Sequence, residues 1–247
     1  MNSGLNVLSL FDGISCGQIA LDRIGYKVNK YFASEIKKHA IKCTNHNYPH
    51  TIQLGDVRNI RYSKNYIKVD DVHSPKKFNV DTIHLFLAGS PCKGISRLNK
   101  NQTGLEHDES RLFYEAVRIL REVQTDNPNV YFLFENTHGN REAVEIITKT
   151  LGVNPISINS RLVSAQNRPR YYWTNIQYIT NTPLLLLVIT PSLYVSTYLN
   201  LTRISLLYDK STGDFLHLIS HSGLSTKISL LISSLAFALY RDWETIR

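Results

Sequence analysis

The chain has 247 residues, of which 43% are hydrophobic and 19% charged, a balance that is typical of a soluble globular protein and excludes a fibrous or disordered chain. This length allows one large domain, or one domain with a smaller second one. The net charge of +8 favours a polyanionic partner, nucleic acid first, although basic surfaces without such a partner are common.

Cysteine usage and the N-terminus predict a protein of the cell interior. Cys16, Cys43 and Cys92 lack the spacing of metal ligands, and their odd number argues against a disulfide framework. We therefore expect no metal and a reducing compartment, cytoplasmic or nuclear. The first residues show no basic segment followed by a long apolar one, so we expect that the protein is not secreted.

The chain opens with the pattern of a strand, a glycine turn and a helix. Residues 5–11 are apolar, the turn holds Gly13 and Gly17, and helical spacing then continues to Gly25. This pattern favours the start of a nucleotide-binding α/β domain, with backbone N–H groups at a helix N-terminus available to an anionic group. An ordinary glycine turn explains the same pattern equally well.

Acidic residues stand at or near the ends of three further predicted strands. Residues 31–34 lead to Glu35, a short strand ends near Asp56, and residues 129–134 lead to Glu135. An acid after the second strand can hold ribose hydroxyls, although Glu35 can equally be an ordinary solvated glutamate. The segment that follows Asp56, residues 58–79, is polar and basic, and we interpret it as a loop or a weak helix.

The central predicted strand, residues 83–88, leads directly into Gly89-Ser90-Pro91-Cys92. A short apolar run bounded by turn residues indicates a buried parallel strand. A cysteine just beyond the carboxyl end of such a strand lies where open α/β sheets bind ligands. Taken alone, Cys92 is equally typical of a small buried thiol. Residues 97–108 have no apolar period and predict a mobile polar loop.

Helices alternate with strands along the first two thirds of the chain. Helical spacing covers residues 19–24, 36–46, 110–123 and 142–151, and two more strands are predicted at residues 156–160 and 171–176. This alternation predicts an α/β fold, in which a mostly parallel sheet carries helices on both faces.

The composition changes after about residue 183, where Leu and Ser predominate. We therefore divide the chain into a domain of residues 1–180 and a divergent C-terminal segment of residues 181–247, which we expect to be loosely packed or folded in a different way. The uncharged run over residues 176–202 is long enough to suggest a membrane-spanning helix. Its two prolines and its many Thr, Ser and Asn residues argue against one, so no membrane partner is expected.

Several motifs over about residues 5–176 agree in order and spacing with one known family. They are Leu8-Ser9-Leu10-Phe11-Asp12-Gly13-Ile14, Glu35, Asp56-Val57, Ser90-Pro91-Cys92, Arg111-Leu112-Phe113-Tyr114-Glu115, Phe134-Glu135-Asn136 and Gln166-Asn167-Arg168-Pro169-Arg170. The ordered set resembles the DNA cytosine-5 methyltransferases, particularly the de novo type and its phage and bacterial relatives. The resemblance implies the Rossmann-like fold of class I S-adenosylmethionine-dependent methyltransferases.

The resemblance also implies a cofactor, a partner and a set of site residues. The cofactor is S-adenosylmethionine, and the partner is double-stranded DNA with a flipped cytosine. By this resemblance the cofactor is bound by Phe11, Asp12, Gly13, Ile14, Ser15, Gly17, Glu35, Ile36, Asp56, Val57, Ser90 and Pro91. Glu35 matches the family's ribose-binding acid, and Asp56-Val57 its adenine-contacting pair. The residues assigned to catalysis are Cys92, Glu135, Arg168 and Arg170.

The reaction that the resemblance implies needs these residue types. Carbon 5 of cytosine is a poor nucleophile, and a thiolate that adds at carbon 6, here Cys92, turns the ring into an enamine able to attack a methyl sulfonium. A carboxyl group at N3 and N4 relieves the charge that builds on the ring, and Glu135 is expected there. Arg168 is expected at the base O2, and Arg170 at a backbone phosphate or at Glu135. For both arginines, a solvated or phosphate-positioning role is the alternative.

The chain also departs from the family pattern. Lys93, Ile95 and Thr137 stand where the family usually has Gln, Phe and Val. After about residue 178 we find no match to the family's target-recognition region or to its final motif. Two other functions therefore stay open: a catalytically impaired or regulatory DNA-binding paralogue without a complete cofactor pocket, and a tRNA cytosine-5 methyltransferase. The sequence predicts neither the target sequence nor the oligomeric state.

Overall fold

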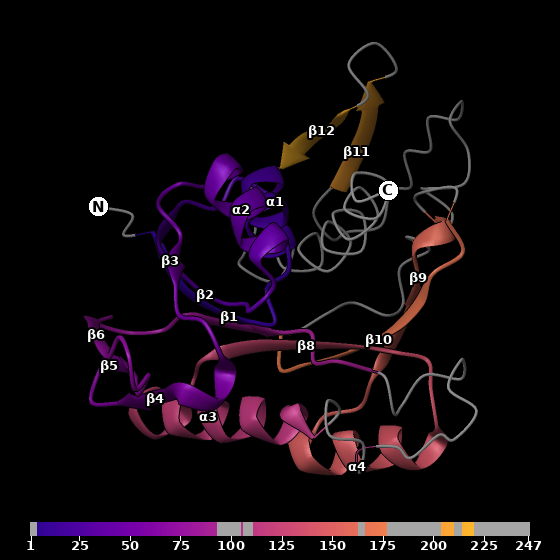
Figure 1. The fold of residues 1–247 in the computed structure, drawn as a ribbon. Helices are drawn as coiled ribbons and strands as arrows, with labels where there is room; N and C mark the ends of the chain where they lie inside the picture. Colours follow the sequence, from indigo (N-terminus) through magenta and orange to yellow (C-terminus); the bar gives the residue numbers. More distant parts are fainter. Residues whose placement is uncertain are drawn as a thin grey trace.

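The computed structural model describes residues 4–92, 105, 111–162, 166–176, 204–209 and 214–219. Its largest element is a seven-stranded sheet in the order β3-β2-β1-β7-β8-β10-β9 (Figure 1). The strands are β1 (Leu5–Leu10), β2 (Val28–Ser34), β3 (Ile52–Gln53), β7 (Leu85–Ala88), β8 (Tyr131–Thr137), β9 (Ile156–Asn159) and β10 (Pro169–Thr174). Within this sheet β10 runs in the direction opposite to the other six strands. The predicted mostly parallel α/β sheet is confirmed.

Helices cover both faces of this sheet. They are α1 (Cys16–Arg23), α2 (Lys38–Asn47), α3 (Leu112–Asp126) and α4 (Arg141–Leu151), with short 3-10 turns at η1 (Val57–Asn59) and η3 (Ser160–Leu162). Figure 1 shows α1 and α2 on one side of the sheet and α3 and α4 on the other. The helix predicted over residues 36–46 begins at Lys38, because the preceding residues bind the Glu35 side chain through their N–H groups.

The two faces of the sheet are apolar because successive side chains of a strand point to opposite sides. On one face Leu8 and Phe86 pack with Phe113 of α3 in a single buried cluster. On the other face Val7 and Leu87 pack in a second cluster with residues of α1. All four residues of β7 are buried, as expected for a central parallel strand covered on both sides.

A second sheet of three antiparallel strands occupies the segment that we predicted to be a loop or a weak helix. Its strands are β4 (Ile60–Ser63), β5 (Tyr66–Val69) and β6 (Lys76–Asn79). The sequence prediction for residues 58–79 is therefore wrong. Lys64 and Asn65 join β4 to β5 with φ angles of 50° and 62°, a two-residue turn whose strongest sequence signal is a glycine. That signal is absent here, so the hairpin is hidden in the sequence.

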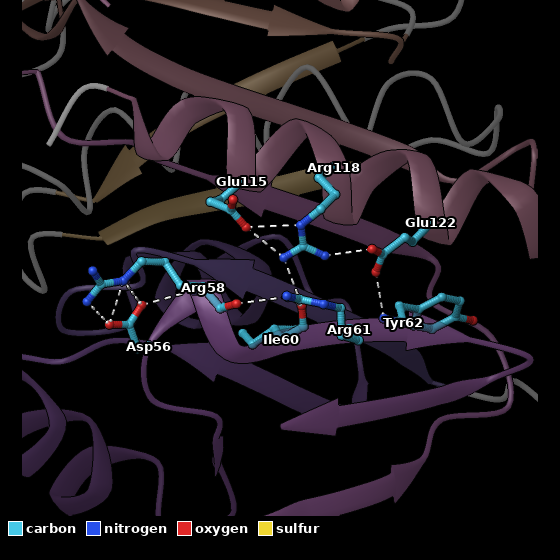
Figure 2. Close-up of polar contacts among 8 residues, drawn as sticks. All are labelled: Asp56, Arg58, Ile60, Arg61, Tyr62, Glu115, Arg118 and Glu122. Carbon is cyan, nitrogen blue, oxygen red and sulfur yellow. Dashed lines mark hydrogen bonds and ion pairs between the residues drawn. The ribbon is translucent and has the colours of Figure 1, made fainter. Parts of the chain in front are cut away.

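Helix α3 supplies hydrogen-bonding partners along the edge of β4 (Figure 2). Arg118 Nη2 donates to the Ile60 carbonyl at 2.9 Å, and Glu122 Oε2 accepts from the Tyr62 N–H at 2.7 Å. Arg118 is held in place by ion pairs of 2.8 Å to Glu115 and 2.6 Å to Glu122. An exposed strand edge is a site of unwanted pairing, and these side chains bind two backbone groups of that edge.

We expect Arg118→Met to lower the free energy of unfolding by about 2 kcal/mol, because it removes charged hydrogen bonds and leaves two carboxylates without their partner. Arg141→Met is the matched control, since its i,i+4 ion pair with Glu145 is exposed and contributes little. Guanidinium denaturation of both variants measures the difference. Equal effects of the two substitutions would contradict a special role for the α3–β4 contact.

Two strands are described in the C-terminal segment. β11 (Ile204–Asp209) and β12 (Asp214–Ile219) pair in antiparallel fashion. The predicted domain boundary at residue 180 and the rest of the predicted divergent segment lie outside the described residues, and so does the predicted mobile loop, apart from a buried Leu105. Within the described ranges, no helix is both long and apolar enough to cross a membrane.

Candidate active site

The carboxyl ends of β7 and β8 place the cysteine loop next to a carboxyl group. Ala88 of β7 is in register with Phe134 of β8, so Gly89 and Glu135 follow side by side. A Cβ added to Gly89 would lie 3.7 Å from Glu135 Oε2, so this carboxyl group lies over the loop. Glu135 does not follow its strand, as the sequence suggested, but lies inside it, because β8 continues to Thr137 through pairing with β10.

Glu135 is paired with a cation inside the protein. Arg170 Nε lies 2.8 Å from Glu135 Oε1. Burial raises the pKa of Glu135 above its usual value, whereas the positive charges of Arg170 and Arg168 act to lower it. The opposed effects suit a carboxyl group that holds or shares a proton with a bound base.

Arg168 is close enough to both the Glu135 carboxyl group and the Cys92 thiol for each to affect its pKa. Burial lowers the pKa of Arg168, and the charge of Arg170 acts in the same direction, while Glu135 and Cys92 act to raise it. The Nε atom of Arg168 is buried without a hydrogen-bond partner among the described residues. An unpaired buried donor is costly, and this one is available to an acceptor oxygen beside Cys92 and Glu135.

The loop that carries the thiol is anchored to the sheet by Asn136. Its Nδ2 atom donates to the Ser90 carbonyl at 3.3 Å and to Ser90 Oγ at 3.2 Å, and both residues are buried. Two residues beyond Ser90, Cys92 is half-buried and packs against the main core. The sequence analysis named Asn136 only as part of a motif and did not predict this anchoring role. Its position directly after Glu135 is the feature of the sequence that could have indicated it.

Several residues of the turn after β1 have a left-handed backbone conformation. Phe11, Gly13 and Ser15 have φ angles of 56°, 60° and 65°. A Cβ at Gly13 would meet no atom within 4 Å, so the backbone there faces open space. Gly17 differs, because its Cβ would lie 2.5 Å from Tyr31 Oη and clash. The absence of a side chain at Gly17 therefore lets α1 pack closely on the sheet, and its predicted contact with the cofactor stays a prediction.

Glu35 closes this turn from the end of β2. Its Oε2 atom accepts from the Gly13 N–H at 2.9 Å. Its Oε1 atom accepts from the N–H groups of Ile36 and Lys37 at 2.8 and 2.9 Å. A carboxylate offers about four lone-pair sites, so one acceptor position of Glu35 is left. Ile36 beside it is 65% exposed and presents an apolar surface next to that acceptor.

Asp56 does not end a strand, as predicted, but caps the 3-10 turn η1. Its Oδ1 atom accepts from the Arg58 backbone N–H at 2.9 Å. The Arg58 guanidinium also binds the carboxylate, with Nε 3.0 Å from each oxygen, and lowers the pKa of Asp56. The neighbouring Val57 is 3% exposed and belongs to the core. Arg58, which sequence reasoning missed, therefore uses the acceptor positions predicted for an adenine amine.

Asp12 is the second titratable group of the turn. Its carboxylate accepts hydrogen bonds from Ser15 Oγ and, at 2.8 Å, from Tyr31 Oη. Burial raises the pKa of Asp12 to about 6, although the hydrogen bonds oppose this shift. Asp12 thus stabilises the turn by binding Ser15 and Tyr31. Because its pKa is about 6, its charge changes near neutral pH. Two further residues that were predicted to bind the cofactor are half-buried: Ile14 in this turn and Pro91 directly before Cys92.

A family model of C-5 cytosine-specific DNA methylases matches residues 5–182. The chain belongs to this family. The resemblance predicted from the motifs is therefore confirmed, and the matched range contains every predicted site residue. Within the described residues of this methylase-family chain, no group of three or more His, Cys, Asp or Glu side chains could hold a metal ion.

Individual relatives are similar over part of their length. The orphan methyltransferase M.Rho11sI of Bacillus phage rho11s is 30% identical over 183 residues, which cover 69% of this chain and 32% of that protein. The DNA (cytosine-5)-methyltransferase DRM2 of Arabidopsis thaliana is 34% identical over 122 residues, or 49% and 19% of the two chains. The methylase-family chain thus spans about a third or less of these curated relatives.

Among solved structures, a prophage-encoded E. coli protein described as a DNA modification methyltransferase is 24% identical. The alignment has a TM-score of 0.49 and covers 69% of this chain and 46% of that one.

The raised pKa of Asp12 predicts a pH-dependent stability of this methylase-family domain. The folded protein holds the Asp12 proton more tightly than the unfolded chain, whose carboxyl has the usual value of 3.8. The stabilisation from Asp12 is therefore present at low pH and is lost as the pH rises through 6. We expect the difference in unfolding free energy between wild type and Asp12→Asn to fall by about 2 kcal/mol from pH 4 to pH 7. Urea denaturation across this range measures it, and a difference that does not change with pH would contradict it.

Proposed function

We propose that the chain transfers a methyl group from S-adenosylmethionine to carbon 5 of cytosine in DNA, through a covalent adduct with Cys92. The observation that carries this proposal is the convergence of a thiol, a buried carboxyl group and two arginines at one edge of the sheet. Cys92 and Glu135 both act on the pKa of Arg168, and Arg170 pairs with Glu135 at 2.8 Å. Membership of the C-5 cytosine-specific DNA methylase family supports the same reaction.

In the proposed reaction, the Cys92 thiolate forms a bond from Sγ to carbon 6 of a flipped cytosine. Glu135, whose pKa is raised by burial, hydrogen-bonds N3 and N4 of the ring as electron density accumulates there. The buried, unpartnered Nε of Arg168 donates to the base O2. S-adenosylmethionine supplies the electrophilic methyl group. The carbon-5 proton then passes to solvent, its electron pair forms the double bond between carbons 5 and 6, and the bond from carbon 6 to Sγ breaks to return the Cys92 thiolate.

The turn around Gly13 fits the proposed cofactor in three respects. The backbone at Gly13 faces open space, so a ligand can approach it closely. The remaining acceptor position on Glu35 suits one ribose hydroxyl. The exposed Ile36 side chain suits the face of an adenine ring. Glu35 fixes the backbone at Gly13 and Ile36 through hydrogen bonds, which supports a cradle formed before the ligand binds.

One observation favours a second candidate, a catalytically impaired DNA-binding paralogue. Arg58 binds Asp56 through its guanidinium and its backbone N–H, and adenine cannot use the same lone pairs. If Arg58 keeps that position, cofactor affinity is weak and methyl transfer is slow. Calorimetry with S-adenosylmethionine separates the two candidates, because only the active enzyme is expected to bind it. Arg58→Gln is informative here, since it leaves Asp56 available.

Cys92→Ser is expected to abolish methyl transfer, because an alcohol is far less acidic and less nucleophilic than a thiol. Affinity for duplex DNA should survive, because it depends mainly on phosphate contacts. The assay is transfer of tritiated methyl to mixed-sequence DNA, together with trapping of a covalent adduct on 5-fluorocytosine DNA. Cys43→Ser is the control, since Cys43 is a half-buried free thiol on α2. Turnover without any trapped adduct would remove Cys92 from the mechanism.

Glu35→Ala is expected to weaken S-adenosylmethionine binding by roughly tenfold to a hundredfold, the effect of losing hydrogen bonds to a charged group. Asp56→Ala should weaken binding similarly if Arg58 releases Asp56 to the cofactor. Glu145→Ala serves as the control, because Glu145 is exposed on α4. Calorimetric affinities that stay unchanged in both test variants would show that the cofactor assignment is wrong.

A further inference from the structure

The second sheet presents a row of cations on its outer face. Arg61 of β4 is in register with Lys68 of β5, and Lys68 is in register with Lys77 of β6. All three residues are exposed. Residues that are directly opposite on neighbouring strands point to the same side of a sheet, so the three cations share one face. We refer to this face of β4, β5 and β6 as the basic face.

The opposite face of the same sheet is apolar and packs in the core, so folding of this sheet does not require the three cations. Ile60, Tyr62, Ile67 and Val69 alternate with the exposed residues and are buried in the main core. Like charges that stand directly opposite one another destabilise a sheet. The basic face therefore costs stability, and packing of the apolar face offsets that cost.

Neighbouring acids do not neutralise the basic face. Among the described residues, neither Lys68 nor Lys77 forms an ion pair, and Lys77 Nζ instead lies 3.9 Å from the centre of the Tyr66 ring. Arg61 donates through Nη1 to the carbonyls of Arg58 and Ile60 (Figure 2). Lysines on an edge strand such as β6 can prevent unwanted strand pairing. That explanation does not cover Lys68, because β5 is the central strand.

We propose that the basic face binds the phosphate backbone of duplex DNA. Strands lie about 4.8 Å apart, so the row spans about 10 Å. Over that length of helix axis one strand of a duplex carries about three phosphates, so long cationic side chains of the row have several phosphate charges within reach. The identity of the duplex as substrate rests on the proposed function.

The same surroundings disfavour an anionic membrane as the partner. Among the exposed large apolar side chains of the described residues, Val72, which is 93% exposed, lies closest in sequence to β5. It lies outside β4, β5 and β6, so it is not part of the basic face. A membrane-binding surface needs apolar anchors beside its cations, and the basic face itself carries Tyr66 alone as a large partly apolar side chain.

Binding of the full chain to a fluorescent 20-base-pair DNA duplex tests the proposal. The variant Arg61→Gln/Lys68→Gln/Lys77→Gln is compared with the control Lys27→Gln/Lys42→Gln/Lys149→Gln, which removes the same charge from exposed positions elsewhere. We expect at least a tenfold loss of affinity at about 0.15 M salt for the first variant, and less than a threefold loss for the control. The slope of log affinity against log salt should fall by about 2 to 3, since each phosphate contact contributes about 0.9.

Single substitutions keep the test open if the triple variant does not fold. Lys77→Gln should weaken binding about threefold, whereas Lys76→Gln should not, because Lys76 alternates with Lys77 along β6 and points to the other side of the sheet. Equal losses in the two triple variants, or in the two single variants, would overturn the proposal. Tighter binding of a duplex RNA, or an equal loss of binding to phosphatidylserine vesicles, would also overturn it.

Methyl transfer is measured separately on the same variants. If the chain transfers no methyl group and yet the basic-face variant loses DNA affinity, the proposed function fails and the basic face stands. If wild type transfers methyl groups and the basic-face variant binds DNA as tightly as wild type, the proposed function stands and the basic face is rejected.

Discussion

The parallel register of β1, β7 and β8 is the constraint on which the candidate site depends. Each strand pairs along most of its length with its neighbour, so their carboxyl ends finish at one edge. The chain leaves that edge as the turn at Asp12 and the loop at Cys92, while Glu135 projects there from β8. Apolar side chains on both faces hold this register, since a slip by one residue would turn every side chain to the opposite face.

Buried polar groups then fix the chain beyond the strand ends. Asn136 binds the loop before Cys92, and Glu35 binds three backbone N–H groups around the first turn. Burying such groups is costly unless they are hydrogen-bonded. Glu135 forms an ion pair of 2.8 Å with Arg170, whereas Arg168 Nε has no hydrogen-bond partner among the described residues. This unmet donor supports the proposed site, where a bound ligand would supply the missing acceptor.

Helix α3 links this site to the second sheet. Its apolar side packs on the main sheet through Phe113, and its polar side binds the edge of β4 through Arg118 and Glu122. One helix therefore supports both sheets, and the exposed cations of β4, β5 and β6 are held on a rigid element. Rigid presentation matters for phosphate binding, because ordering long side chains on a flexible loop would cost conformational entropy.

The sequence by itself determined the central strands, the four helices and the order of the site motifs, because long apolar periods and glycine turns are local signals. It did not reveal β4, β5 and β6, since the Lys64-Asn65 turn lacks glycine and the alternation is masked by many cations. Only the tertiary structure decided the partners of single polar groups. Arg58 binding Asp56, Asn136 anchoring Ser90 and Tyr31 crowding Gly17 all join residues through geometry that no local pattern records. The pairing of β8 with β10 likewise places Glu135 inside a strand, because strand ends depend on the neighbouring strand rather than on the strand's own residues.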